Sequence, residues 1–503
     1  MIIKCFKVND NIFYVTDPNA SKNSFIGQPV KEEPIPTYDE VANLLPQPIW
    51  DGHEDMLRCY DKTWQIAFRN LRKANPEAGF VSNFIDTAFN GYLFMWDSSF
   101  IVMFGKYASR LFNFQGTLDN FYARQHKDGF ICRELCEEAA GEQFTRDDPA
   151  STGPNVMPWA EWEYYQSTGD KERLSRVFDP LCAYHRWLML NRSWPDGSYW
   201  SCGLACGMDN QKRLEPQYSE IMSHGFMKWI DTSAQQYLSA TLLVEIAKVL
   251  DREDEVQWLK DEAKLLESII NSQMWSDKDA FYYDTYRDGS HSGIKSIAAY
   301  WTLLAGLVSP ERLDGFVAHL DNEKEFKRPN RVPTLSADAA GYDNDMGGYW
   351  NGAVWAPTNY MVLRGLHNHG YDKLAHEIAQ DFLHHVVEVF KVTGTVHENY
   401  GPETPKPGSG RGDFVGWTGL APISMLFEYI FGIHPDAQNR KITWHVNCLE
   451  RHGIQRYPLG DATVELVCEA RTSQDEKPVI HVKSNLPVTV EVIWNGNSEI
   501  ISA

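Results

Sequence analysis

Apolar residues recur at helical spacing through most of the chain, and short polar turns separate the runs. In residues 169–191 they recur at intervals of three and four, which places them on one face of a helix. The positions are Leu174, Val177, Leu181, Tyr184 and Leu188. Residues 372–390 repeat the pattern with Leu374, Ile378, Phe382, Val386 and Phe390. Polar turns near Thr168, Val249 and His369 would let each following helix fold back on the one before it.

About twelve helices are predicted in the central region. They span residues 52–74, 97–112, 115–126, 158–168, 170–192, 232–251, 255–275, 292–306, 310–320, 355–369, 372–392 and 417–431. Joined in pairs, they would form six hairpins and close into an (α/α)6 toroid. Strands and helices do not alternate here, which argues against a TIM barrel or a Rossmann sheet. The predicted fold class is therefore mainly α.

Both ends of the chain show the alternating pattern of strands instead. Ile2–Val8 and Asn11–Thr16 are predicted strands, followed by a proline-rich connector over Gln28–Pro48. After Gly432, alternation returns in 441–446, 463–470, 478–484 and 488–494. We predict a small antiparallel β unit there, which the N-terminal strands could join; it is expected to support the fold. The predicted domains are N-terminal strands and linker (1–50), a helical barrel (51–435) and a C-terminal β domain (436–503).

The composition is that of a globular protein, with 43% hydrophobic and 23% charged residues among 503. The formal net charge of −21 argues against binding to nucleic acid or to an anionic membrane, because an acidic surface repels phosphate. The first residues lack the pattern of a signal peptide, and no run of about 18 apolar residues occurs. We expect a cytoplasmic or periplasmic protein with no signal peptide in this chain. The oligomeric state stays open.

The cysteines and histidines do not form the spacings that metals require. Nine cysteines cannot all pair with one another, and Cys132/Cys136 and Cys202/Cys206 lack the close Cys/His quartets that zinc prefers. We expect mostly buried free thiols and no metal site. His384 and His385 cannot both face one metal from a helix, so a solvated face is expected there.

Tryptophan is frequent, with 17 residues, and several lie among glycines, asparagines and aspartates. Trp350 and Trp355 occur in such a stretch, and Trp417 occurs in a second one that also contains Glu398. Flat aromatic faces stack on the C–H face of a pyranose, while carboxylates and amides bind its hydroxyls. Either a large core or a sugar-binding cleft accounts for the tryptophans; their polar neighbours favour the cleft.

Five irregular segments are too long for simple connectors and are expected to form the functional loops: 92–99, 128–134, 194–213, 338–355 and 394–417. Cleavage of a glycosidic bond needs one protonated carboxyl and one ionised carboxylate. Asp209 and Glu398 are the candidates within these loops, although an acid in a loop is more often a turn or cap residue. Asp97 could cap a helix starting at Ser98 or bind sugar hydroxyls.

Other side chains in these regions have weaker signals. Glu161 and Glu163 lie on a predicted helix, where solvent exposure is expected. Trp200 and Phe130 could line a pocket or pack in the core. The glycine-rich stretch 407–414 lacks the Gly-Lys-Ser/Thr end of a phosphate loop, and we expect a flexible flap over the cleft.

Three ordered motifs resemble one family of carbohydrate-active enzymes. The segment YWNGAVWAPTNYMVLRGL from Tyr349 resembles the YWRGPVW-type signature of glycoside hydrolase family sixty-three, which includes processing α-glucosidase I and bacterial mannosylglycerate hydrolases. MWDSSF from Met95 is similar to a Trp-Asp segment that this family shares with trehalases. HENYGPETPKPGSGRGDFVGWTGL from His397 is similar to its Glu-Asn-Tyr segment with a closing Phe-x-Gly-Trp-Thr. The resemblance runs from about residue 50 to residue 432.

The resemblance implies an (α/α)6 barrel and an inverting mechanism, with Asp209 as general acid and Glu398 as general base. It places six further side chains at the sugar: Trp96, Asp97, Trp350, Asn351, Trp355 and Trp417. Trp200 is expected to join them and, with Leu204 and Met208, to keep Asp209 protonated in apolar surroundings. Asn351 replaces the family's usual Arg and Ala353 its usual Pro, and the lost guanidinium would have offered bidentate contacts to the sugar or aglycone.

The function predicted from these residues is an inverting glycosidase for short α-glucosides, α-mannosides or glycosyl-glycerates, needing no metal or organic cofactor. Inversion requires the two carboxyls to be roughly 6.5–9.5 Å apart, with a water between carboxylate and sugar. Two alternatives stay open: a non-catalytic carbohydrate-binding protein, and an (α/α)6 sugar epimerase or phosphorylase.

Overall fold

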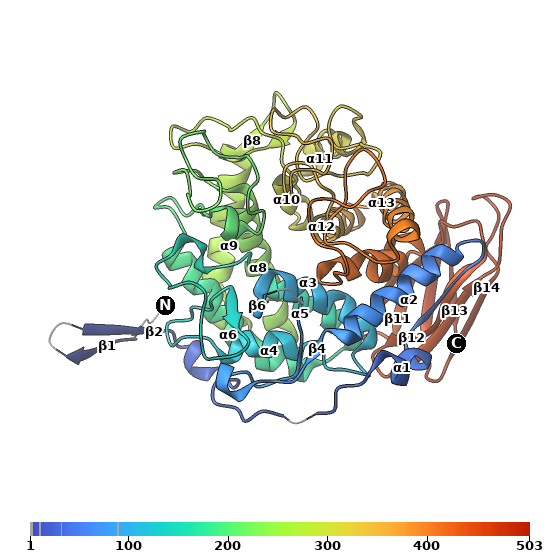
Figure 1. Cartoon of the computed structure of the whole chain (residues 1–503), viewed down its shortest axis with the longest axis horizontal. Coiled ribbons are helices and arrows are strands. Elements are labelled where there is room, and N and C mark those ends of the chain that lie inside the picture. Colours follow the sequence, from blue (N-terminus) through green and yellow to red (C-terminus); the bar gives the residue numbers. More distant parts are fainter. Residues whose placement is uncertain (1–3, 10–11, 32, 88–89) are drawn as a thin grey trace.

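The computed structural model describes residues 4–9, 12–31, 33–87 and 90–503, and helices form the main body of the molecule (Figure 1). The longer helices are α2 (Glu54–Arg69), α3 (Met95–Gly105), α4 (Gly116–Ala123), α5 (Met157–Thr168), α6 (Lys171–Asn191), α8 (Ile230–Val249), α9 (Gln257–Ile269), α11 (Pro310–Ala318), α12 (Ala356–Asn368) and α13 (Asp372–Thr393). Short helices are α1 (Tyr38–Val41), α7 (Gly203–Cys206) and α10 (Trp301–Leu304). The 3-10 turn η10 (Trp417–Leu420) continues into the π-helix η11 (Ala421–Ile430).

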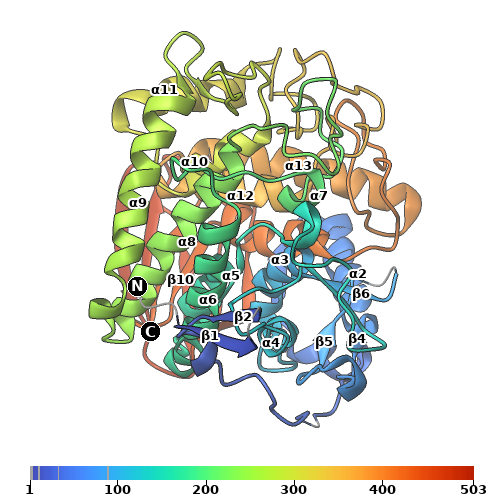
Figure 2. The same cartoon turned by 90° about the vertical axis from the view of Figure 1, so that its left-hand side faces the viewer.

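Six of these elements contact one another in a closed circuit. The order is α3, α5, α8, α10, α12 and η10, and η10 returns to α3. Every residue of α3 is buried, which fits a sequence that is apolar on nearly all sides. The amphipathic helices α6, α9 and α13 each pack against the member of the circuit that precedes them in sequence. Figure 2 shows α9 on the outer side of α8.

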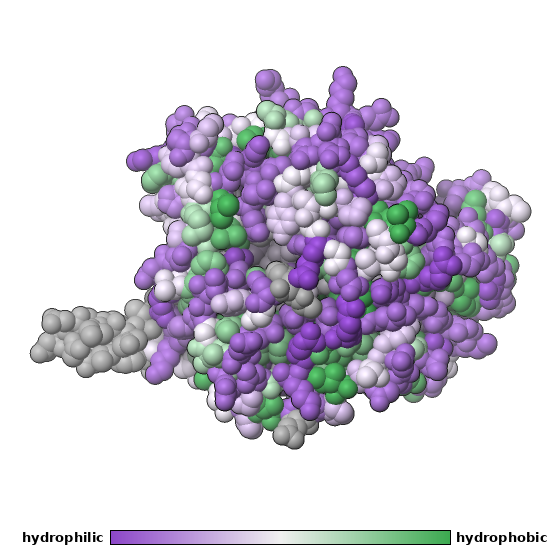
Figure 3. Space-filling model, in the orientation of Figure 1, coloured by the Kyte–Doolittle hydropathy of each residue, from purple (hydrophilic) through white to green (hydrophobic). Residues whose placement is uncertain are grey.

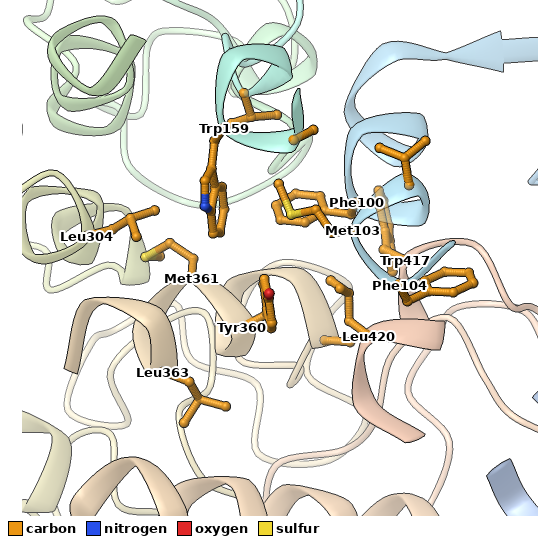
Figure 4. Packing of buried hydrophobic residues seen from close by; sticks show 14 of the residues in the cluster. Phe100, Met103, Phe104, Trp159, Leu304, Tyr360, Met361, Leu363, Trp417 and Leu420 are labelled. Atoms are coloured by element: carbon orange, nitrogen blue, oxygen red, sulfur yellow. The ribbon is translucent and has the colours of Figure 1, made fainter. Parts of the chain in front are cut away.

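Side chains fill the interior of this circuit. In Figure 4, aromatic and aliphatic groups from different members of the circuit point toward one another. They are Phe100 and Met103 of α3, Trp159 of α5, Leu304 of α10, Tyr360 and Met361 of α12, and Trp417 and Leu420 of η10. Trp159 stacks on Tyr360 with ring centroids 5.8 Å apart and meets Trp301 edge-on at 5.9 Å. The circuit therefore encloses a packed core, and a functional cavity can open only at one of its ends.

The observed helices follow the predicted ones closely, with two informative differences. Helix α3 begins at Met95, so Asp97 lies in its first turn and does not cap it; Phe94 is the N-cap residue. The helix predicted over 292–306 is confined to the 3-10 turn η8 (Ile297–Tyr300) and α10. The backbone of Ser296 pairs with Leu335 in extended conformation, and its side chain caps Ala298 N–H, so helix cannot start earlier.

Two four-stranded sheets lie together at the right of the helical body in Figure 1. One has the order β10 (Ile433–Asp436), β11 (Lys441–His445), β15 (Thr489–Trp494) and β16 (Asn497–Ser502). The other has the order β14 (Ile480–Ser484), β13 (Ala462–Cys468), β12 (His452–Leu459) and β3 (Gln47–Trp50). The prediction of a purely antiparallel unit was wrong in one pair: β11 and β15 are parallel. Between β11 and β15 the chain forms β12, β13 and β14 of the other sheet. It then re-enters the first sheet, where β15 runs in the same direction as β11.

The N-terminal contribution to these sheets comes from β3, which begins in the last two residues of the predicted proline-rich connector. Strand β3 pairs with β12, with His452 opposite Trp50. Strands β1 (Lys4–Asn9) and β2 (Ile12–Thr16) pair only with each other among the described strands. Residues 2, 3 and 11 of the two predicted N-terminal strands lie outside the described residues. Three two-stranded sheets complete the inventory: β4 (Leu71–Arg72) with β5 (Phe84–Ile85), β6 (Tyr92–Phe94) with β7 (Glu134–Cys136), and β8 (Trp275–Ser276) with β9 (Phe281–Tyr282).

The expectation of exposed acids on α5 was wrong. Glu161 and Glu163 are both buried, because α5 belongs to the inner circuit and packs against α3, α6 and α8. Glu161 is paired with Arg173 and Glu163 with Arg364, each at 2.7 Å. His385 is also buried, whereas His384 is exposed as expected.

The polarity of the surface and the state of the cysteines agree with the composition. The face in Figure 3 is mostly hydrophilic, with small scattered apolar patches. The eight cysteines whose side chains are described are unpaired thiols, and all except Cys136 are buried. Within the described ranges, helices of sufficient length and apolar character to cross a membrane do not occur.

Candidate active site

A cavity of about 210 Å³ opens where all five predicted functional segments meet, and the start of α3 lies in the first of them. Four carboxyl groups line it, from Asp97, Glu134, Asp209 and Glu398, together with one guanidinium, from Arg133. The other lining residues are aromatic, apolar or small polar ones: Asn90, Phe94, Met95, Trp96, Gly153, Leu204, Gly207, Tyr349, Trp350 and Trp417. The structure thus brings Asp209 and Glu398, which are 189 positions apart in the chain, to one cavity.

Both oxygens of the Glu398 carboxyl accept a hydrogen bond. Tyr349 Oη donates to Oε1 at 2.7 Å, and the Arg411 backbone N–H donates to Oε2 at 3.1 Å. Burial raises the pKa of Glu398 above its ordinary value, while these two donors and the Arg411 charge oppose the rise. Donors of this kind favour the ionised form and fix the direction of the carboxylate. Glu398 is thereby held as a hydrogen-bond acceptor at the cavity wall.

Asp209 has a different environment. It follows the short helix α7, and its side chain is partly exposed to the cavity. Burial raises its pKa to about 7; Arg133 opposes the rise, and the charges of Glu134 and Glu398 add to it. At neutral pH a substantial fraction of Asp209 therefore carries a proton. A carboxyl in this state can donate that proton to an oxygen placed in the cavity.

Asp97 is the most buried of the three predicted acids, at 5% exposure. Burial raises its pKa well above the ordinary value, and the charges of Glu398 and Asp209 raise it further. A protonated Asp97 would be both donor and acceptor, as binding a sugar hydroxyl requires.

Three tryptophans form a stacked group behind the cavity wall. Trp350 and Trp355 lie face to face, with ring centroids 3.8 Å apart and planes 3° apart. Trp417 packs its edge against both, at 6.2 Å and 5.4 Å. Their indole N–H groups hold the backbone of the site: Trp355 Nε1 donates to Tyr349 O at 3.0 Å, and Trp417 Nε1 to Glu398 O at 3.3 Å. Trp350 and Trp417 reach the cavity, and Trp355 supports them from behind.

Comparison with known proteins identifies the family. The model of the mannosylglycerate hydrolase MGH1-like glycoside hydrolase domain matches residues 91–418, about two thirds of the chain. This chain belongs to that family of glycoside hydrolases. The matched segment contains every residue that lines the cavity except Asn90.

Individual relatives of this glycoside hydrolase are distant. An uncharacterised protein of Borreliella burgdorferi is 26% identical over 385 residues, which cover 74% of this chain and 78% of that protein. A probable mannosyl-oligosaccharide glucosidase of Schizosaccharomyces pombe is 23% identical over 78% of this chain, which spans about half (49%) of the yeast protein. The structure of a family sixty-three mannosylglycerate hydrolase from Thermus thermophilus in complex with glucose superposes with a TM-score of 0.60 at 19% identity. The superposition covers 73% of this chain and all of the Thermus thermophilus chain, and it shows that the two share a fold.

Three predicted sugar-contacting residues of this hydrolase lie outside the cavity lining. Asn351 joins two loops: its Nδ2 donates to Asn210 O at 3.0 Å, and its Oδ1 accepts from Lys212 N–H at 2.9 Å. Trp355 lies behind Trp350, as described above. Trp200 contacts Arg192 in a cation–π arrangement at 4.9 Å and borders a separate small cavity with Gly153 and Pro154. Direct sugar contacts by these three side chains stay predictions, and the structure shows each packed against protein.

Arg133, Glu134 and Tyr349 line the cavity but were not singled out in the sequence. Arg133 and Glu134 are the last two residues of the predicted loop 128–134, and Tyr349 lies in the predicted loop 338–355. The composition of these segments therefore identified the loops but not these three residues. Tyr349 has a φ of +66°, in the left-handed region that side chains larger than glycine rarely adopt. Sequence alone does not show this conformation, which directs the phenol toward Glu398.

The predicted flap over 407–414 is bonded to the segment that carries Glu398. Glu398 N–H donates to Arg411 O at 2.9 Å, and Gly410 N–H donates to Asn399 Oδ1 at 3.0 Å. A Cβ atom at residue 410 would lie 2.8 Å from both Cβ and Oε2 of Glu398. The glycine therefore allows the close approach that lets the Arg411 N–H reach the carboxylate.

One group of side chains in the described part of the chain could hold a metal ion, and it lies away from the cavity. His367, Asp372 and His445 place their ligand atoms within 4.8 Å of one another near the turn between α12 and α13. Asp372 already accepts a hydrogen bond from His367 Nδ1 at 2.6 Å. None of the three lines the cavity that contains Asp209 and Glu398.

Proposed function

We propose that this glycoside hydrolase cleaves α-glycosidic bonds with inversion, using Asp209 as general acid and Glu398 as general base. The observation that carries the proposal is the opposite environment of two carboxyls on one cavity. Asp209 has a pKa of about 7 because of burial and neighbouring negative charges. Glu398 receives two hydrogen bonds that favour its ionised form. Paired carboxyls with separated protonation are what acid–base hydrolysis of a glycoside needs.

In this mechanism Asp209 donates its proton to the glycosidic oxygen as the bond to the anomeric carbon breaks. Glu398 accepts a proton from a water that attacks the anomeric carbon from the opposite face of the ring. Asp97, Trp96 and Trp350 hold the sugar, and Trp417 forms the floor of its pocket. The proposal requires a carboxyl separation of roughly 6.5–9.5 Å in the complex, which leaves room for that water.

The architecture we assign is an (α/α)6 barrel. The closed circuit of α3, α5, α8, α10, α12 and η10 would be its inner ring, and α6, α9 and α13 would belong to the outer ring. We divide the chain into N-terminal strands and linker (1–50), catalytic barrel (51–435) and C-terminal β domain (436–503). Strand β3 makes the linker part of the C-terminal sheets, so the outer two units support each other.

The proposed substrates are α-glucosides or α-mannosides of the short oligosaccharide or glycosyl-glycerate type. The cavity of about 210 Å³ is smaller than the roughly 300–1,000 Å³ of pockets for drug-sized ligands, which favours one sugar ring at the catalytic carboxyls. Relatives of this chain include proteins named mannosyl-oligosaccharide glucosidase, periplasmic trehalase and mannosylglycerate hydrolase. All three names describe hydrolysis of a bond to a hexose.

Substitution of the two acids tests the assignment. We expect Asp209→Asn and Glu398→Gln each to lower kcat by at least about a thousandfold, within the range for losing a general acid or base, with sugar binding retained. Asp97→Asn is the matched control, because Asp97 is assigned to binding the sugar and takes no part in the proton transfers. It should mainly raise KM. Turnover near the wild-type rate in Glu398→Gln would end the assignment.

The reaction type is tested by NMR of the anomer formed first from a panel of α-linked disaccharides and glycosyl-glycerates. A β-anomer as first product supports inversion. An α-anomer, or cleavage that depends on added phosphate, contradicts it; the second result would indicate a phosphorylase.

A further inference from the structure

Two imidazoles and one carboxylate converge where the helical body meets the C-terminal sheets. His367 lies in the last turn of α12, Asp372 is the first residue of α13, and His445 is the last residue of β11. Their ligand atoms all lie within 4.8 Å of one another. The expectation of no metal site rested on spacings within short stretches of sequence, and this group is assembled by the tertiary fold from separate elements.

Hydrogen bonding joins only two members of this group. His367 Nδ1 donates to Asp372 Oδ1 at 2.6 Å. His445 Nδ1 lies 3.8 Å from the other oxygen, Asp372 Oδ2, which is beyond hydrogen-bond distance. One carboxylate therefore has an imidazole nitrogen near each of its oxygens, and the second nitrogen is close to the carboxylate without being bonded to it.

The spacing of the three groups fits a tetrahedral metal ion. Zinc binds imidazole nitrogen and carboxylate oxygen at about 2.0–2.2 Å, which places neighbouring ligand atoms roughly 3.3–3.6 Å apart. The observed nitrogen–oxygen separations of 2.6 and 3.8 Å lie on either side of that range, so small rotations of the side chains bring them onto one ion. The three side chains are 20%, 26% and 19% exposed, and water can therefore supply the fourth ligand.

A third imidazole, that of His434 on β10, holds the other two rings in place. It stacks on His367 with ring centroids 3.8 Å apart and planes 7° apart, and it meets His445 edge-on at 5.9 Å. His434 is 9% exposed, and its Nδ1 has no hydrogen-bond partner among the described residues, so this ring is positioned by packing. Imidazoles already held by packing lose little side-chain freedom when a metal binds, which favours binding.

We propose that His367, Asp372 and His445 bind a zinc ion, which ties the hairpin of α12 and α13 to the C-terminal sheets. Two imidazoles and one carboxylate suit zinc, whereas calcium and magnesium prefer oxygen ligands alone. None of the three residues lines the cavity that contains Asp209 and Glu398. The ion therefore stabilises the junction between helices and sheets and takes no part in hydrolysis, so the inference is independent of the proposed function.

Metal binding is measured on the full chain, without a polyhistidine tag, after treatment with a chelator and dialysis. Calorimetric titration with zinc chloride should give one ion per chain with a Kd of about 10 µM or tighter, weaker than closed structural sites because one ligand is water. Cobalt(II) should give the intense visible absorption of a tetrahedral site. Failure to bind zinc at a concentration about tenfold above that Kd would overturn the inference.

Variants identify the ligands. Asp372→Asn keeps an acceptor for His367 but loses the charge, and His445→Ala removes one imidazole; each should weaken zinc binding by about a hundredfold or more, since losing even a supporting contact costs roughly 10–100-fold. His481→Ala is the matched control, because His481 lies 3.4 Å from the Glu469 carboxylate in an exposed pair. It should bind zinc like the wild type. Undiminished binding in both Asp372→Asn and His445→Ala would place the ion elsewhere, for example on the carboxyls of the catalytic cavity, and would overturn the inference.

Thermal unfolding measures the linking role. With zinc about a hundredfold above its Kd, the Tm of the wild type should rise by about 2 °C or more, because the ion binds only where the fold brings the three residues together. The rise should persist in His481→Ala and vanish in Asp372→Asn and His445→Ala. Each variant is compared with itself in chelator, so a change in its basal stability does not affect the result. Binding of zinc to the wild type with no rise in Tm would contradict the linking role.

Discussion

Asp209 and Glu398 have similar side chains and different surroundings, and that difference divides the chemistry between them. Burial and the charges of Glu134 and Glu398 raise the pKa of Asp209 to about 7, with Arg133 opposing. Glu398 is also buried, but Tyr349 Oη and the Arg411 N–H hydrogen-bond its two oxygens and favour the charged form. One residue can therefore hold a proton at the pH at which the other has lost its own.

The pH dependence of the reaction follows from these two groups. We expect a bell-shaped profile of kcat/KM. Activity should decline as the pH rises through about 7, because Asp209 loses the proton that it must donate. It should also decline on the acid side, where Glu398 gains a proton and can no longer activate water.

The variant Glu134→Gln checks the origin of the alkaline limb. Removing one negative charge that raises the Asp209 pKa should shift this limb to lower pH and leave the acid limb in place. A limb that stays where it is in Glu134→Gln, or activity that is constant through the alkaline range, would contradict the assignment of Asp209.

At the scale of elements, the site is built where irregular segments brace one another at the start of α3. Asn351 and Asn210 exchange hydrogen bonds with neighbouring backbone groups and join the loop of Asp209 to that of Tyr349. The glycine-rich segment 407–414 is bonded to the Glu398 segment. Each carboxyl is thus positioned by contacts between segments far apart in sequence, which limits the movement of the loops relative to one another.

Gly410→Ala tests this bracing. The added Cβ would lie 2.8 Å from Glu398 Oε2 and should displace the carboxylate or the Arg411 N–H. We expect kcat to fall by roughly a hundredfold, the scale of effect from a displacement of about 1 Å at a reacting group, with a smaller change in KM.

Gly141→Ala is the matched control, because a Cβ there would meet its nearest neighbour, Cys136 Cβ, at an ordinary 3.4 Å. It should retain wild-type kinetics. Normal kcat in a folded Gly410→Ala protein would show that the close approach of residues 410 and 398 is not needed for catalysis.

At the scale of the whole molecule, a buried charge cluster ties the inner circuit together. Lys106, which follows α3, contacts Glu163 of α5 at 3.1 Å and Glu428 of η11 at 3.0 Å. Arg364 of α12 contacts the same two acids at 2.7 Å and 3.0 Å. Tyr107 and Tyr360 donate to the two oxygens of Glu428. Two cations and two anions with these hydrogen bonds keep each charge compensated in the interior.

Removing one charge from this cluster should destabilise the fold without altering the chemistry. For Glu428→Ala we expect a loss of about 3–5 kcal/mol, because Lys106 and Arg364 would share one remaining carboxylate in a buried setting. The measurement is the midpoint of urea or thermal unfolding, together with KM and kcat at a temperature where the variant is folded.

The exposed pair of Glu245 and Lys248 provides the control, since both side chains are 47% exposed. Glu245→Gln should change stability by less than about 0.5 kcal/mol. An equal effect of the two substitutions would show that burial of the cluster does not matter.

Sequence patterns were sufficient for most of the helices and for the segments that carry the acids. Periodicity over 170–192 and 372–392 predicted α6 and α13 almost to the residue, because amphipathic helices are encoded locally. The tryptophan- and glycine-rich loops were identified by their composition, and Asp209, Glu398, Trp96, Asp97, Trp350 and Trp417 do line one cavity.

Other features could not be deduced, because they arise from contacts between distant segments. Glu161 and Glu163 were expected to be exposed, and only the packing of α5 inside other helices shows that ion pairs bury them. The pairing of β3 with β12 and the parallel pairing of β11 with β15 depend on how the chain returns, which local alternation does not encode.

The sequence by itself determined the mainly helical character, the β unit at the C-terminal end and the loops in which the acids lie, since each depends on residues that are neighbours in the chain. Tertiary structure alone decided the protonation states and partners of those acids. The Tyr349 hydroxyl, the Arg411 N–H and the Arg133–Glu134 pair come from different loops, and electrostatic interactions act through the space between them, whatever their separation in sequence.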